Sequence, residues 1–494
     1  MRRFFRRHDR QITRALEILP GFLSWNLILF PFWGAFFSPL LVGYFILAFD
    51  VFWLYKSASL ALTATLSHFK IRASEKLDWL REVKGFGDWQ KVHHLVLIPT
   101  YQEPLHILRR TIRRLSEQTF PAKQITVVLA TEIREKEAVV KAKILKKEFG
   151  SYFGQFLITV HPDIPGEVKG KSSNQAWAGK QAKEYLVDKL KYNLDYLTIT
   201  SLDADGLLHP QYFAYLTFKF LDSPQRYRLF WHSAVMHYNN YWRVPAPIRV
   251  INTIGSVWRT GILIRRDRLI QMSVYSASLK MIDEVGYWDV DVIPEDYRIF
   301  FKCFFHFQGK VEVEPIFLAT FVDAAESTSY WRTMVNQYEQ MKRWAWGVSD
   351  DPQLIKWWFT APQVSFWDKT IHLLKVLEDH VLWPVNWFII TLGVNIPTLI
   401  NPNFRRLALG FNLPRLSFWI LTACLFFLGI VLIINARQRP PRPKHISRWR
   451  SFLIPFEFLL MPIVGFFFNA LPGLDAHTRL MLGKYLEYRV TEKV

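Results

Sequence analysis

Two aspartates one residue apart suggest a metal site. Asp203 and Asp205 follow the β-rich apolar run 196–200. Two carboxylates with this spacing at a strand end can approach one hard cation, and Mg²⁺ or Mn²⁺ takes such oxygen ligands while sharing its other positions with phosphates and water. The competing interpretation is a polar turn, because Asp-x-Asp also occurs by chance. The pattern alone leaves both open.

A second acidic pair precedes an apolar, helix-like run. Glu295 and Asp296 stand just before residues 299–305. Acids at a helix N-terminus can serve simply as caps that the helix dipole favours. The functional alternative is a general base, because an acceptor hydroxyl is a poor nucleophile until a positioned carboxylate takes its proton.

A third group combines an amide, a guanidinium and an indole. Gln340 and Arg343 are three positions apart, with Trp344 beside them. On a helix this spacing makes the first two surface neighbours. Arginine suits diphosphate oxygens by bidentate donation, and an indole face suits the apolar side of a sugar ring. The alternative is an amphipathic interfacial helix with snorkelling basic side chains, and the two interpretations are compatible.

The elements that position these groups follow an α/β pattern. Short β-rich runs at 95–98 and 126–129 alternate with charged helical stretches such as 132–149. This alternation is the signature of a parallel α/β sheet. The run at 96–104 ends in a polar turn containing Glu103, at the edge of the sheet where ligands of α/β proteins bind; an ordinary strand–loop junction would look the same. We expect this catalytic domain to span residues 57–325.

The N-terminal region is expected to enter the membrane. No charged residue occurs from 18 to 49, and a membrane helix needs roughly 20 residues. The stretch therefore predicts two helices that turn at Ser38-Pro39, within a first segment 1–56; a single long tilted helix is the alternative. The arginines before it, including Arg2 and Arg3, place the N-terminus and the catalytic domain on the cytoplasmic side of an inner or plasma membrane.

Apolar runs return after the catalytic domain. We expect interfacial amphipathic helices at 326–379, and membrane helices within 380–472 that include runs at 381–400 and 418–434. A third run at 452–471 contains two prolines and a glutamate, which favours a re-entrant or interfacial element over a simple span. A tail, 473–494, completes the chain.

Composition excludes several other classes of protein. The net charge of +20 could indicate nucleic acid, but the basic residues lie beside apolar segments and no nucleic-acid motif accompanies them, which favours attraction to anionic lipid. We therefore expect no nucleic-acid partner. Cys303 and Cys424 are too few for a disulfide framework or a zinc ligand set. Any metal must be held by oxygen ligands.

The order of these elements between two apolar blocks carries a resemblance. Residues 96–347 resemble the membrane-bound, cellulose-synthase-like members of glycosyltransferase family 2, which also include chitin and hyaluronan synthases. The four elements look like that family's N-terminal strand motif, its Asp-x-Asp, its Thr-Glu-Asp and its Gln-x-x-Arg-Trp. The resemblance implies a GT-A-type fold, an α/β domain with a Rossmann-like mixed sheet, flanked by transmembrane helices.

The resemblance also implies roles for single residues. Asp203 and Asp205 would hold the metal and the nucleotide diphosphate, and Asp296 would be the catalytic base with Glu295 shaping the site beside it. Lys171, in a loop at 170–174 similar to a lysine-containing loop of the family, would touch the diphosphate. The remaining nucleotide-sugar-binding residues implied are Glu103, Gln340, Arg343 and Trp344, of which the last three would also bind the acceptor end.

The sequence departs from the family at three points. Glu132 stands where the family has an aspartate that contacts uracil, so the resemblance makes it a substitute candidate for binding the base. Pro294 replaces the threonine of Thr-Glu-Asp. Residues 488–493 are similar to the gating-loop motif Phe-x-Val-Thr-x-Lys of cellulose synthases, with Tyr488 in place of the phenylalanine.

The resemblance implies an inverting, metal-dependent transfer of a hexose from a nucleotide-sugar, by expectation a UDP-sugar, to a growing polysaccharide at the membrane. A single addition to a lipid acceptor is the alternative within the same class. A transporter or membrane scaffold that merely binds nucleotide is the alternative outside it. A transporter or scaffold could lose the acids and keep the strands. Here the acids are present at positions 203, 205 and 296, so an enzyme is the preferred hypothesis.

Overall fold

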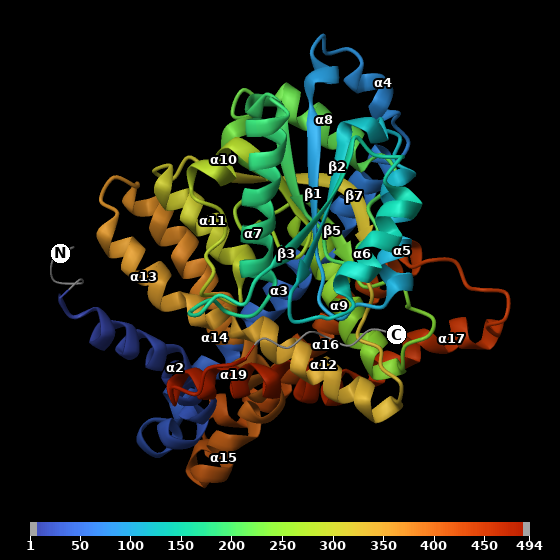
Figure 1. The fold of residues 1–494 in the computed structure, drawn as a ribbon. Coiled ribbons are helices and arrows are strands. Elements are labelled where there is room, and N and C mark those ends of the chain that lie inside the picture. Colours follow the sequence, from blue (N-terminus) through green and yellow to red (C-terminus); the bar gives the residue numbers. More distant parts are fainter. Residues whose placement is uncertain (1–6, 488–494) are drawn as a thin grey trace.

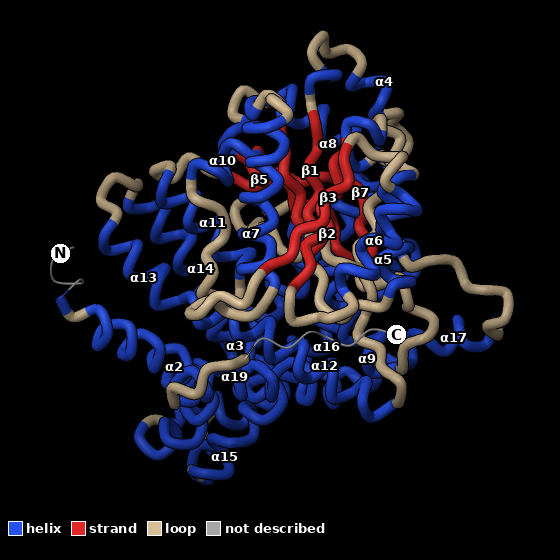
Figure 2. The backbone as a smooth tube through the Cα atoms, viewed as in Figure 1, coloured by secondary structure: helices blue, strands red, loops and turns tan. Residues whose placement is uncertain are grey.

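The structure, a computed structural model, describes residues 7–487 of the 494. A sheet with its covering helices forms one half of the molecule, and long helices from both ends of the chain lie together beneath it (Figure 1). All of the strands belong to the upper half, and the lower half is helical (Figure 2). The chain thus has an α/β domain seated on a layer of helices.

The sheet has seven strands in the order β3-β2-β1-β4-β6-β5-β7. Strand β6 runs antiparallel to both β4 and β5, and the other neighbouring pairs are parallel. This is the mixed α/β sheet expected of a GT-A-type domain, so the predicted fold class is confirmed. The strands are β1 (His93–Pro99), β2 (Ile125–Glu132), β3 (Gln155–His161), β4 (Leu197–Ser201), β5 (Leu229–Met236), β6 (Tyr275–Ser278) and β7 (Glu312–Phe321).

Helices cover both faces of the sheet. In β1, Leu95 and Leu97 belong to one hydrophobic core, and Val96 and Ile98 belong to the other. Because successive side chains of a strand point to opposite faces, a strand buried on both sides reads as one continuous apolar run. The covering helices are α5 (Leu105–Ser116), α6 (Ala138–Phe149) and α8 (Tyr212–Asp222) on one face, and α7 (Lys171–Lys183), α10 (Leu279–Glu284) and α11 (Glu295–His306) on the other.

One predicted helix begins later than expected. Glu132, taken as the first residue of a helix at 132–149, is instead the last residue of β2, where it pairs with His161 of β3. The helix that follows, α6, begins at Ala138. The strand continues because the neighbouring strand supplies backbone hydrogen bonds up to this position.

Within residues 7–487, five helical segments are long and apolar enough to cross a membrane: α2 (Asp9–Phe37), α3 (Pro39–Ser74), Phe366–Ile400, α16 (Ala408–Gln438) and Arg448–Met481. The N-terminal stretch forms two helices rather than one. They meet at Ser38, whose side chain accepts a hydrogen bond from the Leu41 amide and caps α3. Together with the α/β domain, these segments make the chain a membrane protein.

Two predicted domain boundaries fall inside helices. The boundary after residue 56 lies within α3, which continues to Ser74 because it packs along α9 (Ala246–Ile262) of the α/β domain. The boundary after residue 379 lies within α14 (Phe366–Leu392). There Glu378 forms an ion pair with Lys56 of α3. A hydrophobic run shows only which part of a helix is apolar. Helices α3 and α14 extend beyond their apolar parts, where they contact other elements of the protein, so the boundaries read from the runs fall inside them.

The last apolar segment is broken and lies against the α/β domain. It comprises α17 (Arg448–Glu457), α18 (Met461–Gly465) and α19 (Leu471–Met481), which run beneath the domain (Figure 1). Glu457 accepts two hydrogen bonds from Arg249 of α9, at 2.7 and 2.9 Å. This ion pair accounts for a carboxylate in an otherwise apolar run, since a buried charge needs a partner.

Close contact between α3 and α9 depends on Gly261, and this gives a stability prediction. A Cβ at this position would lie 2.9 Å from Thr63 Oγ1 and 3.3 Å from the Ala64 backbone nitrogen. We expect Gly261→Ala to lower the free energy of unfolding by about 1–3 kcal/mol through overpacking. Gly429→Ala in α16 is the matched control, because a Cβ there would meet nothing within 4 Å. Thermal melts of both variants in detergent check this, and equal melting temperatures would contradict it.

Candidate active site

One pocket of about 680 Å³ lies between the carboxyl ends of the strands and the helices beneath them. The turn after β1, the loop after β4 and the start of α11 contribute to it from the sheet side, and α3, α9, α12 (Tyr330–Ala345) and α14 contribute from below. It brings together all of the residues predicted for the site: Glu103, Glu132, Lys171, Asp203, Asp205, Glu295, Asp296, Gln340, Arg343 and Trp344.

Lys171 lies at the centre of the acidic groups. It is the first residue of α7, and its Nζ is 2.9 Å from Asp203 Oδ1 and 2.9 Å from Glu295 Oε1. It also donates to the Ser273 carbonyl at 3.1 Å. Burial alone would lower the pKa of Lys171, but Asp203, Glu295 and Asp296 outweigh it and raise that pKa well above its usual range. The ammonium is therefore a fixed positive charge between two acids that are 92 positions apart in sequence.

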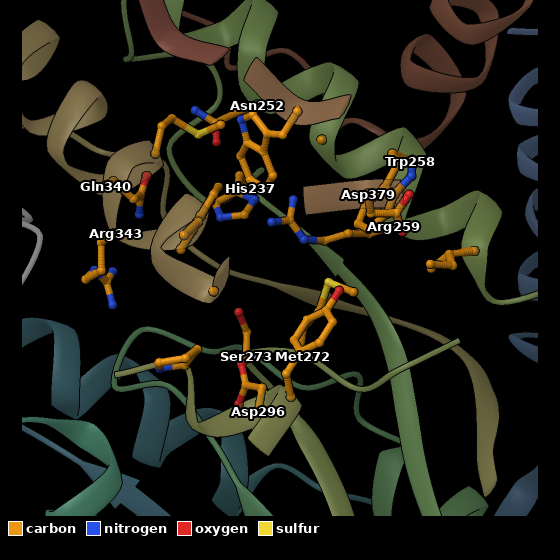
Figure 3. A pocket seen from close by; sticks show the side chains of 18 of the residues that line it. His237, Asn252, Trp258, Arg259, Met272, Ser273, Asp296, Gln340, Arg343 and Asp379 are labelled. Atoms are coloured by element: carbon orange, nitrogen blue, oxygen red, sulfur yellow. Dashed lines mark hydrogen bonds between the residues drawn. The ribbon is translucent and has the colours of Figure 1, made fainter. Parts of the chain in front are cut away.

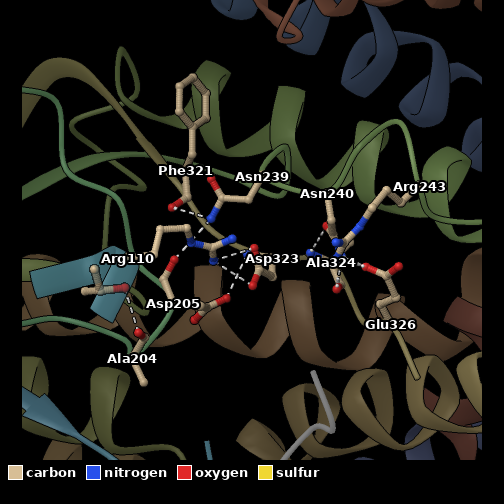
Figure 4. A network of polar contacts seen from close by, with 11 residues as sticks. Arg110, Ala204, Asp205, Asn239, Asn240, Arg243, Phe321, Asp323, Ala324 and Glu326 are labelled. Atoms are coloured by element: carbon tan, nitrogen blue, oxygen red, sulfur yellow. Dashed lines mark hydrogen bonds and ion pairs between the residues drawn. The ribbon is translucent and has the colours of Figure 1, made fainter. Parts of the chain in front are cut away.

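Asp205 is held by the residues that follow another strand, β7 (Figure 4). Its side chain is fully buried, and Oδ2 accepts a 2.7 Å hydrogen bond from the Asp323 backbone amide. Arg110 of α5 in turn donates to both carboxylate oxygens of Asp323, at 2.9 and 2.8 Å. This chain of contacts fixes the orientation of the Asp205 carboxylate.

The predicted cation site has two protein carboxylates. Among residues 7–487, no group of three or more His, Cys, Asp or Glu side chains is arranged to hold a metal ion. Asp203 keeps 28% of its side chain exposed towards the pocket, and Asp205 is fixed beside it. This donor set fits Mg²⁺ or Mn²⁺ bound jointly with a diphosphate, because such ions keep several waters and take one or two carboxylates plus phosphate oxygens. The bound metal itself stays a prediction.

Asp296 faces the pocket from the first turn of α11 (Figure 3). Its Oδ2 accepts a 2.7 Å hydrogen bond from the Ser273 amide, whereas Oδ1 is shielded from solvent and has no hydrogen-bond partner among the described residues. Burial, followed by the neighbouring Glu295 carboxylate, raises the pKa of Asp296 well above 3.8. An oriented carboxylate whose Oδ1 has no hydrogen-bond partner among the described residues, and whose proton affinity is increased, is suited to accept a proton.

The raised pKa of Asp296 gives a pH prediction. A base must be ionised to act, so kcat/KM should rise with pH, about tenfold per unit, until the pH exceeds the pKa of Asp296 in the free enzyme. Because that pKa is raised, the midpoint of this limb should lie above the ordinary 3.8. A pH profile of kcat/KM measures it. A midpoint at 3.8 would contradict the assignment of the limb to this carboxyl.

The Gln-x-x-Arg-Trp residues lie on α12. Gln340 is buried and accepts a hydrogen bond from Gln337 at 3.5 Å, and the Trp344 ring lies 5.6 Å from that of His237. Gln340 and Arg343 occupy one side of the pocket, away from Trp258 (Figure 3). Near the start of the same helix, Trp331 is 76% exposed. The helix thus combines a pocket-facing side with an exposed aromatic end, as the sequence had allowed.

The two glutamates near the strand ends have local partners. Glu103 accepts hydrogen bonds from the Thr100 hydroxyl at 2.7 Å and the Tyr101 amide at 2.5 Å, and so shapes the turn after β1. Glu132 forms an ion pair with Arg134, whose guanidinium lies 4.5 Å from the centre of the Tyr101 ring. Burial raises the pKa of Glu132, and Arg134 opposes that shift. Binding of a nucleotide base by Glu132 stays a prediction.

Three pocket residues escaped the sequence analysis. Asp323 follows β7 as Asp203 follows β4, so the same signal of an acid after a strand could have identified it. Arg259 of α9 and the backbone of Ser273 gave no comparable signal, because neither belongs to a motif. The possible gating-loop residues 488–493 lie outside the described part of the chain.

Comparison with known proteins finds a matching family model. The model of "Glycosyl transferase family group 2" matches residues 198–434, which include both acidic pairs and the Gln-x-x-Arg-Trp residues. A search of the curated proteins finds no match.

The solved structures that are similar to this chain include two with low sequence identity. One is the mannosyltransferase PcManGT from Pyrobaculum calidifontis in complex with GDP-Man and Mn²⁺, at 12% identity and a TM-score of 0.43, over 89% of this chain and 100% of that one. The other is S. aureus TarS 1–349 in complex with UDP-GlcNAc, at 10% identity and a TM-score of 0.35, over 72% and 95%. The similarity to glycosyl transferase family group 2 thus extends over residues 198–434 and includes the two acidic pairs of the pocket.

Proposed function

We propose that this glycosyltransferase transfers a sugar from a nucleotide-sugar to an acceptor hydroxyl by single displacement with inversion, in the pocket that contains Asp203 and Asp296. The observation that carries the proposal is the cluster around Lys171. It joins Asp203 after β4 to Glu295 at the start of α11, beside Asp296. An acidic pair for the donor and a carboxylate base are thereby held around one fixed cation.

Asp296 is the proposed base. Its Oδ1 takes the proton of the acceptor hydroxyl as the hydroxyl oxygen forms a bond to the anomeric carbon. On the opposite face, the bond from that carbon to the diphosphate oxygen breaks, and the nucleoside diphosphate leaves with the electron pair. Ser273 holds the other carboxylate oxygen through its amide. No covalent sugar–enzyme intermediate forms, so the anomeric configuration inverts.

Lys171 is proposed to neutralise the leaving group. The diphosphate gains negative charge as the bond breaks, and a positioned cation in a shielded site stabilises that charge strongly. Lys171 is also the first residue of a 13-residue helix, whose N-terminus favours phosphate groups. Asp203 and Asp205 would hold Mg²⁺ or Mn²⁺, which supplies further neutralisation of the diphosphate when bound.

The catalytic domain is proposed to lie on the cytoplasmic side, with the end of the described chain beside it. Helices α2 and α3 form a pair that returns the chain to the side of its N-terminus. Arg14, near the start of α2, donates to the Leu480 carbonyl at 2.8 Å, and Tyr485 donates to Glu17 at 2.8 Å. These contacts support a last segment that begins and ends on one side, as a re-entrant element does.

The acceptor decides between two products. The sequence favoured a growing polysaccharide, and a lipid that receives a single sugar was the alternative. The apolar part of the pocket favours the lipid, because α3, α9 and α14 contribute large apolar side chains beyond the acids, among them Trp53, Trp258 and Trp383. Electrophoresis and mass spectrometry of the product separate a polymer from a lipid with one added sugar.

A screen of nucleotide-sugars tests the proposed function. Purified protein with native membrane lipids and Mg²⁺ or Mn²⁺ should release nucleoside diphosphate from one donor class, and by expectation from a UDP-sugar. Asp203→Asn should abolish that release. If the protein released no nucleoside diphosphate from any nucleotide-sugar, the proposal would be overturned in favour of a binding or scaffold role.

A further inference from the structure

One part of the pocket, called the branch below, is lined by three helices that carry none of Asp203, Asp205 and Asp296. Two of these helices, α3 and α14, belong to candidate membrane spans. All three contribute apolar side chains, and charged ones such as Lys56 and Glu378 lie in the same lining. The apolar ones include Phe52, Trp53, Leu60, Ile254, Trp258 and Trp383.

Arg259 places a positive charge in this branch. It comes from α9 and extends into the pocket, with Asp296 across from it (Figure 3). Its side chain is 8% exposed, and its Nε has no hydrogen-bond partner among the described residues. The guanidinium lies 5.0 Å from the centre of the Trp344 ring. Within residues 7–487, no carboxylate forms an ion pair with it.

The charge on Arg259 persists at neutral pH. Burial lowers its pKa to about 10, and Tyr297 opposes that shift, so the guanidinium remains protonated near pH 7. A buried charge is costly unless a counter-charge and hydrogen bonds compensate it. The cation–π contact with Trp344 compensates only a small part of this cost.

Four other cations that line the pocket form ion pairs. Lys56 and Arg268 pair with Glu378, Arg265 pairs with Asp267, and Lys171 pairs with Asp203 and Glu295. Arg259 therefore differs from them in having its donors directed at space that a ligand can occupy. An anion is the ligand that this arrangement fits.

We propose that Arg259 binds the phosphate of an amphiphilic lipid acceptor, whose apolar chain lies between α3, α9 and α14 and whose headgroup hydroxyl is directed to Asp296. This inference rests on the proposed function and names its acceptor class. Arginine suits phosphate through its fork of N–H donors. A neutral polysaccharide offers no counter-charge to Arg259, whereas a phosphate-bearing lipid supplies both the anion and the apolar chain.

Binding of three small probes tests the proposal. Dodecyl phosphate has the anion and the chain, dodecanol has the chain alone, and inorganic phosphate has the anion alone. Native mass spectrometry of the full chain in a non-ionic detergent measures each affinity. We expect the wild type to bind dodecyl phosphate, and Arg259→Gln to weaken that binding at least tenfold while binding dodecanol equally. Arg259→Lys, which keeps the charge, should retain most of the affinity.

The control variant is Arg266→Gln. It removes the same charge from a side chain that is 62% exposed and does not line the pocket, so dodecyl phosphate binding should not change. Equal affinity of wild type and Arg259→Gln for dodecyl phosphate would overturn the proposal. So would inorganic phosphate binding as tightly as dodecyl phosphate, because the site would then take a free anion.

A titration with UDP and other nucleoside diphosphates keeps this test separate from the proposed function. One outcome is that nucleoside diphosphates bind the wild type and Arg259→Gln with equal affinity, and that the affinity for dodecyl phosphate is also equal in the two proteins. The acceptor assignment then fails, and the glycosyltransferase site stands. If no nucleoside diphosphate binds the wild type, the proposed donor site fails, whatever dodecyl phosphate does.

Discussion

Asp296→Asn should reduce kcat by about 10³-fold or more while nucleotide-sugar affinity stays within a few-fold of the wild type. General-base catalysis contributes roughly 10²–10⁴-fold, and the amide cannot take the acceptor proton. The substitution keeps the shape of the side chain, so an oxygen can still accept the 2.7 Å hydrogen bond from the Ser273 amide. Initial rates of diphosphate release and equilibrium binding of the donor measure the two effects.

Two comparisons show whether the loss is chemical or structural. Asp291→Asn removes an exposed carboxylate from the loop that precedes α11 and should leave kcat unchanged. Because the folded-state pKa of Asp296 is raised, its favourable contribution to stability is present in acid and is lost as pH rises through that pKa. The melting temperature of Asp296→Asn should therefore exceed that of the wild type by a margin that grows as pH rises. If donor binding fell in parallel with activity, Asp296 would be a structural residue.

Lys171→Gln should reduce kcat by about 10²–10³-fold, the range found when one preorganised electrostatic group is removed from an active site. The variant leaves Asp203 and Glu295 without the ammonium that lies 2.9 Å from each. The diphosphate would then meet uncompensated negative charge, so donor affinity should also fall. Steady-state kinetics and donor binding measure both effects.

Lys169→Gln is the matched control for this variant. Lys169 lies two positions earlier and pairs with Asp163, with 55% of its side chain exposed. We expect it to keep wild-type kinetics. Melting curves exclude unfolding as the cause of lost activity in Lys171→Gln. A folded Lys171→Gln protein with kcat within about threefold of wild type would show that the lysine only bridges the acids.

Much of the site could be predicted because its residues occupy defined places in an α/β fold. Asp203 follows an apolar strand, and parallel strands direct their carboxyl ends to one edge of the sheet. Glu295 and Asp296 begin a helix, as expected from their position before an apolar run. The motifs therefore indicated which residues meet in one pocket, although their order in the chain says nothing of distances.

Other features depend on contacts that a sequence does not display. Arg259 lies in a helix whose pattern is that of any amphipathic surface, and its lack of a carboxylate partner is visible only after α3, α9 and α14 are packed. The same holds for the length of α3, which packs on α9 well past the end of its apolar run. The Asp323 amide reaches Asp205 because β7 and β4 end at the same edge of the sheet.

The most direct measurement is an experimental structure of the Asp296→Asn variant with the nucleotide-sugar that the wild type consumes. We predict that the diphosphate lies beside Asp203, within hydrogen-bonding distance of the Lys171 ammonium. The anomeric carbon should lie between the diphosphate and residue 296. A nucleotide-sugar bound outside this pocket, or one whose anomeric carbon faces away from residue 296, would contradict it.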